Sequence, residues 1–480
     1  MSDSPVPANA DLVARLRSAV GDSAVRTERS EVHLFDHDAS NLVGRAGIVC
    51  YPRTPDQVQA IVRCCHEFGV PFVARGSGTG LAGGATPVDG SVVVCLSKMD
   101  RIISIDVDAR TAWVEPGVLN LDLTRAASEH GLHFAPDPSS QQSCSIGGNV
   151  ANNSGGPHCL AEGVTSAHVL ACDVVLSDGT TVRLGDERFE SAGFDLRGAF
   201  VGSEGMFGIA TAVCVRLTPN PPAVSTMLLD FSTVRDGTDT VSAIIAAGLV
   251  PAALEMMDRL CLEAVEAFVH AGLPTDAATA LLVELAGSPA AVQEDSETVH
   301  RIGLAHGARS VRIAADDEER ALLWKGRKNA FGAIARIAPN YYLHDTVVPR
   351  RHLSEVLDHV YRIAAEHELR VLNVFHAGDG NLHPLLIFDR REPGVLERVH
   401  AAGAEIVRIS VEYGGVLSGE HGIGLEKRDY MPLMFGEVDL AAQSGLRRAF
   451  DPHGLANPHK VLPSPAGCGD AHGHVEGLWV

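Results

Sequence analysis

The residues best suited to chemistry lie in two glycine-rich segments of the C-terminal half, Val-Phe-His-Ala-Gly-Asp-Gly-Asn-Leu-His-Pro and Ser-Gly-Glu-His-Gly-Ile-Gly. The first contains His376 and His383, and the glycines between them predict a turn that brings the two imidazoles together. Glu420, in the second segment, would supply a third ligand. Two histidines and a carboxylate suit zinc or another divalent transition metal, and they leave coordination positions for a substrate. His421 would then be available to move a proton.

The elements that must position these residues follow from the hydrophobic pattern. A helix is predicted around Leu12 to Val20, followed by a strand at 48–51, a helix from Pro55 and a strand at 70–74. Further short β-branched strands are predicted near 91–96, 101–106, 111–115, 168–176 and 208–217. The prolines at 219, 221 and 222 then predict a domain edge.

The second half begins with a repeated β-α-β pattern. The first pass covers strand 226–231, a helix near 236–248 and strand 252–257. The second covers strand 280–286, a helix near 289–306 and strand 310–314. Two such passes predict a ferredoxin-like sheet with helices on one face. Helices at 316–337 and 351–368 should follow, and then the paired strands that carry the two histidines.

Composition limits the function classes and the location. The 480 residues are enough for more than one domain, and the net charge of −21 argues against nucleic acid or an anionic membrane surface as a partner. No apolar run is long enough to span a bilayer, and no secretory signal is expected at the start. The expected location is therefore cytoplasmic, with peripheral association at the inner membrane left open. The ten cysteines form no Cys-x-x-Cys pair, so redox chemistry needs a cofactor other than an iron–sulfur cluster.

Glycine-rich loops elsewhere in the chain are typical of an anion site. Residues 75–84 hold five glycines in ten positions directly after a predicted strand, where backbone N–H groups can approach a phosphate closely. The spacing matches neither the dinucleotide fingerprint nor the P-loop, and taken alone this loop could equally be a flexible turn. Further loops rich in Gly, Ser and Asn follow at 136–156, 163–165 and 201–205. Together they could enclose a long, flat, polar ligand.

These loops, in this order, resemble the flavin-binding domain of the vanillyl-alcohol-oxidase/PCMH family. The segments Ser-Ile-Gly-Gly-Asn-Val-Ala-Asn-Asn and Gly-Val-Thr are the most specific. The two histidine motifs narrow the likeness to FAD-linked D-2-hydroxy-acid dehydrogenases, a group that includes the glycolate oxidase D subunit and D-lactate and D-2-hydroxyglutarate dehydrogenases. The resemblance covers roughly residues 40–461.

The resemblance implies an α+β fold with a PCMH-type FAD-binding domain of two α/β subdomains, a ferredoxin-like antiparallel-sheet substrate (cap) domain and a short C-terminal helical return. The expected boundaries are 1–41 for an N-terminal helical segment, 42–221 for the FAD-binding domain, 222–415 for the cap, 416–462 for a C-terminal segment that completes the active site, and 463–480 for a flexible tail.

The likeness also implies which residues hold the cofactor. The first loop would cradle the FAD pyrophosphate, and the second would line the flavin. The expected cofactor-binding residues are Arg75, Gly76, Ser77, Gly78, Thr79, Gly80, Pro136, Ser143, Gly147, Gly148, Asn149, Asn152, Ser154, Ile209 and Lys460. Because the first loop contains neither His nor Cys, we expect non-covalent FAD.

Oxidation of a 2-hydroxy acid gives each chemical residue a role. A metal held by His376, His383 and Glu420, zinc first and manganese or iron as alternatives, would polarise the substrate hydroxyl. His421 would be the general base and the flavin the hydride acceptor. Arg327 matches the position that binds the substrate carboxylate in relatives, and Asn381 would lie beside the metal.

Two of these assignments have alternatives. Glu420 would instead orient His421 if it were not a ligand. Arg327 lies in a basic run with Lys325 and Lys328, which would also suit a solvated helix face.

The sequence determines the substrate, the electron acceptor and the subunit assembly less closely. Relatives that act on a second carboxylate place a Lys shortly before the Asp of the segment Tyr-Tyr-Leu-His-Asp, and this chain has Leu343 and His344 there. A small acid such as D-lactate or glycolate is therefore favoured, with D-2-hydroxyglutarate or another D-2-hydroxy acid as the alternative. The chain could also be the flavoprotein subunit of a multi-subunit glycolate oxidase or, remotely, an ether-lipid-synthase-like transferase. The electron acceptor could be a quinone, a cytochrome, an electron-transfer flavoprotein or an iron–sulfur subunit, and a homodimer is left open.

Overall fold

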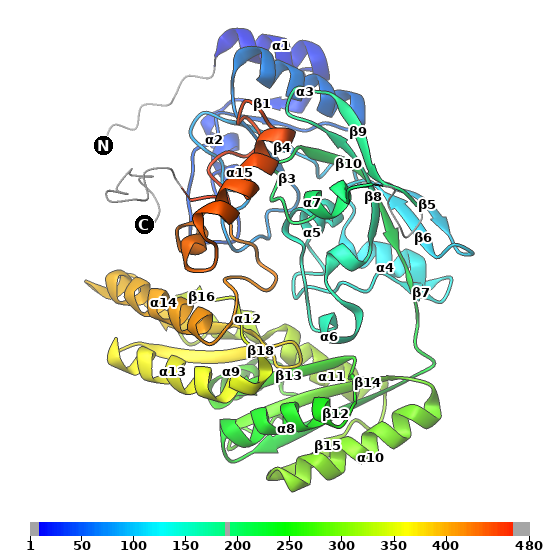
Figure 1. Ribbon diagram of the computed structural model, residues 1–480, viewed down its shortest axis with the longest axis vertical. Coiled ribbons are helices and arrows are strands. Elements are labelled where there is room, and N and C mark those ends of the chain that lie inside the picture. Colours follow the sequence, from blue (N-terminus) through cyan, green and yellow to red (C-terminus); the bar gives the residue numbers. More distant parts are fainter. Residues whose placement is uncertain (1–8, 188–192, 464–480) are drawn as a thin grey trace. The chain divides into compact units, whose positions relative to one another are not determined.

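The computed structural model describes residues 9–187 and 193–463. The chain folds into two compact units, and neither is continuous in sequence (Figure 1). The first unit contains the residues up to Gly155, Val164–Asn220 and the chain from Glu420 onward. The second contains Gly156–Gly163 and Pro221–Gly419. The expected tail beyond residue 463 lies outside the described residues.

The first unit contains a four-stranded sheet in the order β1-β2-β4-β3. Strands β2, β3 and β4 are parallel neighbours, and β1 is antiparallel to β2. Their bounds are Val25–Arg26 for β1, Ile48–Cys50 for β2, Phe72–Arg75 for β3 and Val92–Cys95 for β4. Two amphipathic helices, α1 (Ala10–Val20) and α3 (Pro55–Phe68), bury their apolar faces in the same core, which confirms the predicted helix and strand pattern.

A second sheet of the first unit has five antiparallel strands in the order β5-β6-β10-β8-β9. These strands are β5 (Ile102–Asp106), β6 (Thr111–Val114), β8 (Val169–Val175), β9 (Thr181–Gly185) and β10 (Ile209–Arg216). Three helices, α4 (Asn120–Ser128), α5 (Ile146–Asn152) and α7 (Leu196–Phe200), contribute apolar residues to its core. A small ladder joins β7 (Leu132–His133) to β11 (Thr218–Pro219).

The last part of the chain returns to the first unit. Helix α15 (Glu437–Phe450) places Phe450 in the core of the five-stranded sheet. The following residues extend the four-stranded sheet, because Phe72 N–H donates to the carbonyl of Leu455 and Asn457 N–H donates to the carbonyl of Phe72. The predicted return of this segment is therefore confirmed.

The second unit is built on a nine-stranded sheet. Its first four strands are β12 (Ala223–Phe231), β13 (Ala253–Asp258), β14 (Thr279–Gly287) and β15 (Ala308–Ile313). Their spatial order is β15-β12-β14-β13, and every adjacent pair is antiparallel. This is the order of a split β-α-β sheet, so the predicted ferredoxin-like arrangement is confirmed. The sheet continues from β13 into β18 (Arg370–His376).

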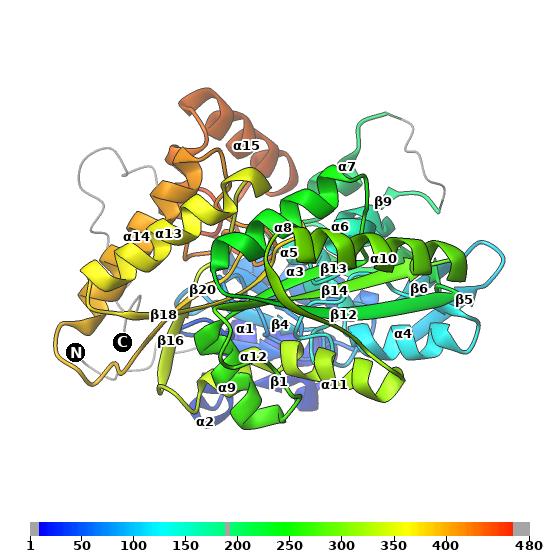
Figure 2. The same ribbon diagram turned by 90° about the horizontal axis from the view of Figure 1, so that it is seen from below.

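Helices cover both faces of this sheet, which corrects the expectation of helices on one face only. Helices α8 (Val234–Ala246) and α10 (Pro289–Ala305) lie on one face, and α9 (Arg259–Val269) and α11 (Asp317–Lys328) lie on the other (Figure 2). The expected single helix at 316–337 is two helices, because α11 ends at Lys328 and α12 covers Ala330–Ile334.

The remaining helices and strands of the second unit complete its core. Helices α13 (Leu353–Glu366) and α14 (Val395–Glu412) bury apolar residues in the same core as α8 and α10. The smaller strands are β16 (Asn340–Leu343), β17 (Thr346–Val347), β19 (Asn381–Leu382) and β20 (Pro384–Phe388). No helix among the described residues is long and apolar enough to cross a membrane.

Candidate active site

The two predicted metal-binding histidines lie at the end of a tight hairpin. Strand β18 ends at His376, which pairs with Asn381 at the start of β19, so residues 377–380 form the turn. Gly380 has a φ of +81°, and a Cβ there would lie 2.1 Å from the carbonyl oxygen of Val348. Only glycine fits this position without strain. The predicted turn is confirmed, and the ring centroids of His376 and His383 are 5.1 Å apart.

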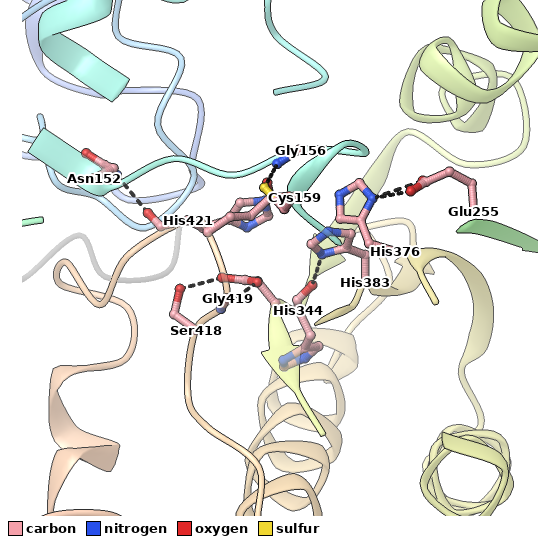
Figure 3. A network of polar contacts seen from close by, with 12 residues as sticks. Asn152, Gly156, Cys159, Glu255, His344, His376, His383, Ser418, Gly419 and His421 are labelled. Carbon is pink, nitrogen blue, oxygen red and sulfur yellow. Dashed lines mark hydrogen bonds and ion pairs between the residues drawn. The ribbon is translucent and has the colours of Figure 1, made fainter. Parts of the chain in front are cut away.

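Each of these imidazoles has a partner for its Nδ1 atom (Figure 3). Nδ1 of His376 lies 2.7 and 2.9 Å from the two carboxylate oxygens of Glu255, and Nδ1 of His383 lies 3.3 Å from the carbonyl oxygen of His344. A carboxylate or carbonyl at Nδ1 fixes the ring orientation and places the proton there. Nε2 of each ring is therefore the nitrogen suited to bind a metal.

Glu420 follows directly on a segment that is anchored in the second unit. The carboxylate of Asp345, fully buried, accepts hydrogen bonds from the hydroxyl of Ser418 at 2.5 Å and from the N–H of Gly419 at 3.0 Å. The chain then continues into Glu420, whose carboxylate and one nitrogen of each of His376 and His383 lie within 4.8 Å of one another. This donor set and spacing fit a divalent transition metal.

Arg327 is buried, not part of a solvated helix face. Its side chain is 1% exposed, whereas Lys325 in the same turn of α11 is exposed. Its Nη2 atom forms an ion pair at 2.5 Å with Glu255. Among the described residues, Nε and Nη1 of Arg327 have no hydrogen-bond partner. Such donors on a buried guanidinium suit a ligand carboxylate, because a buried donor without a hydrogen bond is costly.

Glu255 is the buried residue of this candidate site that sequence reasoning missed. It lies in the middle of β13, is fully buried, and contacts both the proposed metal ligand His376 and Arg327. The signal was present as a carboxylate between apolar residues in the strand Ala-Leu-Glu-Met-Met-Asp. A buried carboxylate requires charged or hydrogen-bonding partners, so its burial alone predicts a polar cluster.

Asn381 lies beside the segment that leads to Glu420. A Cβ on Gly419 would be 2.4 Å from Nδ2 of Asn381, so the two residues are in direct contact. Asn381 is 4% exposed, and its side-chain oxygen has no hydrogen-bond partner among the described residues. A buried amide with unused hydrogen-bonding capacity suits contact with a ligand.

In the first unit, the glycine loop after β3 has the properties of an anion site. No N–H group of residues 76–81 donates a hydrogen bond to another described residue. The guanidinium of Arg75 points back toward the N-terminal segment, where it donates to the carbonyl of His37 at 2.7 Å and lies 5.3 Å from the ring of Phe35. The guanidinium also lies against the loop, since a Cβ on Gly78 would be 2.1 Å from Nη2 of Arg75. The loop's backbone thus offers unused donors for a phosphate.

The second glycine loop packs directly against the first. A Cβ on Gly76 would lie 2.2 Å from Oγ of Ser145, the residue that caps α5. Gly147 contacts Pro116 closely, and the side chain of Asn149 is buried against Asn120 and Cys144. These contacts give Gly76, Gly147 and Asn149 packing roles next to the predicted flavin site.

The other predicted cofactor residues lie around these loops in the first unit. The carbonyl of Ser154 accepts two hydrogen bonds from Thr165, which joins the second loop to the Gly-Val-Thr segment. Ile209 begins β10 and is buried, whereas Ser143 is exposed. Lys460 is fully buried and donates to the carbonyl of Thr86 at 2.7 Å, and burial lowers the pKa of its ammonium group to about 8.

His421 is mostly buried and held by its backbone. Its carbonyl accepts a hydrogen bond of 2.7 Å from Nδ2 of Asn152, the last residue of α5 (Figure 3). Its Nε2 atom lies 3.6 Å from a carboxylate oxygen of Glu420. The predicted base thus lies beside the predicted third ligand, and its main chain is fixed by a residue of the second glycine loop.

Two family descriptions match the chain: FAD binding domain over residues 46–185, and FAD linked oxidases, C-terminal domain, over residues 220–461. The glycolate oxidase subunit GlcD of Escherichia coli (strain K12) is 46% identical over 434 residues, which cover 89% of this chain and 87% of that protein. GlcD of Bacillus subtilis (strain 168) is 40% identical, covering 87% and 89%. The D-lactate dehydrogenase of Anaerostipes hadrus is 32% identical, covering 89% and 92%.

Solved structures share the fold at low sequence identity. p-Cresol methylhydroxylase has a TM-score of 0.81 at 19% identity, covering 95% of this chain and 97% of its own. Alkyldihydroxyacetonephosphate synthase has a TM-score of 0.75 at 15% identity, covering 96% and 86%. These likenesses show the predicted PCMH-type fold and leave the reaction undecided. Together with the sequence matches they show that the chain belongs to the FAD-linked oxidases and is an FAD-linked oxidoreductase of the glycolate oxidase and D-lactate dehydrogenase type.

Proposed function

We propose that this chain oxidises a small D-2-hydroxy acid, D-lactate or glycolate, to the 2-oxo acid with non-covalent FAD and a divalent metal. One observation carries the proposal: Glu255 contacts both His376 and Arg327. A single carboxylate thereby holds a metal-binding imidazole next to a carboxylate-binding guanidinium. A 2-hydroxy acid presents a hydroxyl and a carboxylate on neighbouring carbons, which suits this pair of groups. The likeness to a glycolate oxidase subunit and a D-lactate dehydrogenase supports the same substrate class.

Each residue has a defined task in this proposal. His376, His383 and Glu420 would hold the metal, and Arg327 would orient the substrate through its carboxylate. When bound, the metal would supply Lewis acidity at the substrate hydroxyl, and FAD would supply the acceptor for a hydride. His421 takes the hydroxyl proton on its imidazole. Asn381, beside Gly419, would contact the bound acid through its amide.

The segment Tyr341 to Asp345 supports a small substrate. The position before Asp345 holds His344, and its ring packs against Tyr342, with a centroid separation of 4.6 Å, and against Gly403. His344 thus has a packing role and supplies no flexible ammonium group for a distal carboxylate. D-2-hydroxyglutarate is the alternative substrate that this argument disfavours.

The test is an anaerobic mixing experiment on the purified, flavin-loaded chain. D-lactate, L-lactate, glycolate, D-2-hydroxyglutarate and D-malate are added separately, and the flavin absorbance is followed. We expect rapid bleaching by D-lactate or glycolate, loss of bleaching after chelation, and recovery with zinc or manganese.

Two substitutions extend this test. His376→Ala and His421→Ala should each slow bleaching at least about 100-fold with FAD retained, as expected for loss of a metal ligand or a general base. His306→Ala and His130→Ala are matched controls, because both of these histidines are exposed. Full bleaching rates in His376→Ala and His421→Ala would overturn the proposed function.

A further inference from the structure

Glu204 is a buried carboxylate of the first unit that lies outside the proposed set of metal and substrate ligands. It lies in the loop between α7 and β10, is 4% exposed and has a φ of +50°. Its backbone is held on both sides, since its N–H donates to the carbonyl of Ala151 at 2.8 Å and its carbonyl accepts from Nδ2 of Asn457 at 2.5 Å. Because these hydrogen bonds hold Glu204 in an unfavourable backbone conformation, the surrounding structure fixes where its side chain lies.

The carboxylate of Glu204 accepts two backbone hydrogen bonds from the C-terminal histidine motif. Its oxygens lie 2.6 Å from the N–H of Ile423 and 2.8 Å from the N–H of Gly424. Burial raises the pKa of this carboxyl to about 7, against the opposing effect of the two N–H groups and of the nearby charges of Lys460 and Lys427.

The glycines of this motif are required for the close approach. Gly422 has a φ of +91°, and a Cβ there would lie 2.6 Å from the Glu204 carboxylate. Gly424 has a φ of +54°, and a Cβ there would lie 1.9 Å from the carbonyl oxygen of Ala82. The main chain therefore passes directly over Glu204 and then along the first glycine loop, where Leu425 N–H donates to Ala82.

The segment around His421 is anchored at both ends by different acids. Asp345, in the second unit, holds Ser418 and Gly419 just before Glu420. Asn152 and Glu204, in the first unit, hold the carbonyl of His421 and the N–H groups of the next residues. Glu420 and His421 are adjacent in sequence, yet Asp345 holds the residues before Glu420 and Glu204 holds the residues after His421.

We propose that Glu204 is a positioning residue for the general base: it holds the turn after His421 and so fixes the imidazole to the unit that carries the FAD loops. Asp345 has the corresponding role for Glu420, because it holds the two residues that precede Glu420. This inference rests on the proposed function, in which His421 takes the proton. It predicts that the rate of flavin reduction and the affinity for metal can be changed separately.

The test compares Glu204→Gln with the wild-type holoenzyme. Gln keeps the shape of the side chain but presents an NH₂ group to one of the two N–H donors, so one hydrogen bond is lost and the turn is displaced. We expect the limiting rate of flavin bleaching by D-lactate or glycolate to fall about 10- to 100-fold, the range for a small misplacement of a catalytic group. FAD content, the zinc dissociation constant and the substrate concentration at half-maximal rate should change less than about threefold.

Comparing the limiting rate with cofactor content and metal affinity separates positioning from general destabilisation. A displaced turn after His421 slows the reaction of bound substrate, whereas a destabilised fold would also lower the FAD content and weaken zinc binding. Glu115→Gln is the matched control, because Glu115 is a carboxylate in the same unit that is 2% exposed and pairs with Arg101. It should lower the melting temperature without changing the limiting rate of bleaching.

Gly422→Ala provides a second, independent variant. It keeps Glu204 but places a methyl group against its carboxylate, so it should reproduce the slow bleaching with FAD and zinc retained. Should Glu204→Gln fail to fold, this variant decides alone. Wild-type bleaching in the folded variants, with His421→Ala inactive, overturns the inference and leaves the proposed function standing. Wild-type bleaching in His421→Ala overturns the proposed function itself.

Discussion

At the scale of single residues, one carboxylate of the second unit, Glu255, joins a buried guanidinium to a buried imidazole. Glu255 and Arg327 are 0% and 1% exposed, and their ion pair is completed by Nδ1 of His376. Buried charges are tolerated only when they are paired with good geometry, and removing one partner leaves an uncompensated charge. The arrangement therefore links stability of the unit to the orientation of the proposed metal ligand and substrate-binding group.

Glu255→Gln tests this link. The neutral side chain can still accept from His376, but it no longer compensates Arg327 and polarises the imidazole less. We expect the zinc dissociation constant, measured by competition with a chromophoric chelator, to rise about 10- to 100-fold. Glu263→Gln, at an exposed position on α9, is the matched control and should leave it unchanged. Unaltered zinc affinity in Glu255→Gln would show that His376 needs no carboxylate partner.

At this scale the sequence predicted those residues that lie in a recognisable local motif. The glycines between His376 and His383 predicted the hairpin, and the pair Glu420–His421 could be read from its own motif. Glu255 was missed because its partner His376 is 121 residues away, and periodicity carries no information over that distance. Glu204 and Asp345 escaped for the same reason, with partners 219 and 74 residues away.

At the scale of elements, Glu284 joins parts of the second unit that are distant in sequence. This residue of β14 accepts from Thr226 on β12 at 2.9 Å, from Trp324 on α11 at 2.5 Å and from Arg320 at 3.2 Å. It also pairs at 3.2 Å with His158. This residue lies in Gly156–Gly163, the short segment that belongs to the second unit although the residues on both sides of it belong to the first. The ring of His158 stacks on that of Trp324. This cluster fixes the helix that carries Arg327.

The pKa of Glu284 makes this cluster sensitive to acid. Burial alone would raise it, but His158, Arg320 and Trp324 outweigh burial and lower it from 4.5 to about 2. Because the folded-state pKa lies below the unfolded value, the stabilisation is complete above pH 4.5 and is lost as the pH falls toward 2. It corresponds to about 3 kcal/mol.

Urea unfolding at a series of pH values checks this prediction. Wild-type stability should fall between pH 4.5 and 2 more steeply than that of Glu284→Gln, which lacks the titrating group. Glu294→Gln, at an exposed position on α10, should follow the wild type. Parallel curves for wild type and Glu284→Gln would mean that the carboxylate gains nothing from its partners in the folded state.

Element boundaries followed the sequence where local signals were strong. The β-α-β passes were predicted because alternating strands and an amphipathic helix carry their own periodicity. The expected helix at 316–337 was wrong in one respect, since Asn329 ends α11 and begins α12. Helix α9 was not predicted, although Asp258 caps it by accepting from the N–H of Cys261. Its place on the opposite face of the sheet is a tertiary property.

At the scale of the whole molecule, the first unit needs both ends of the chain. The C-terminal segment contributes Asn457, which donates to the carbonyl of Gly84, and Lys460, which donates to that of Thr86. Gly84 is the last residue of the first glycine loop, and Thr86 lies two residues beyond it. The loop's conformation therefore depends on residues more than 370 positions later.

A truncated chain tests this dependence. A protein ending at Gly419 keeps the region that matches the FAD binding domain family, residues 46–185, but lacks these supports. We expect it to purify without FAD, as judged by the ratio of flavin to protein absorbance. A chain ending at Pro463 retains every contact named above and should keep its FAD. Equal FAD content in both truncated proteins would show that the return segment is dispensable for cofactor binding.

The sequence by itself determined the family, the two β-α-β passes of the second unit, and the candidate site residues in glycine-rich motifs. These are local properties, because periodicity and glycine content act within a few residues. Tertiary structure alone decided that Glu255 joins His376 to Arg327, that Glu204 holds the turn after His421, and that α9 covers the second face of the sheet. Buried polar groups must find partners when water is removed, and only the folded chain shows which distant residues supply them.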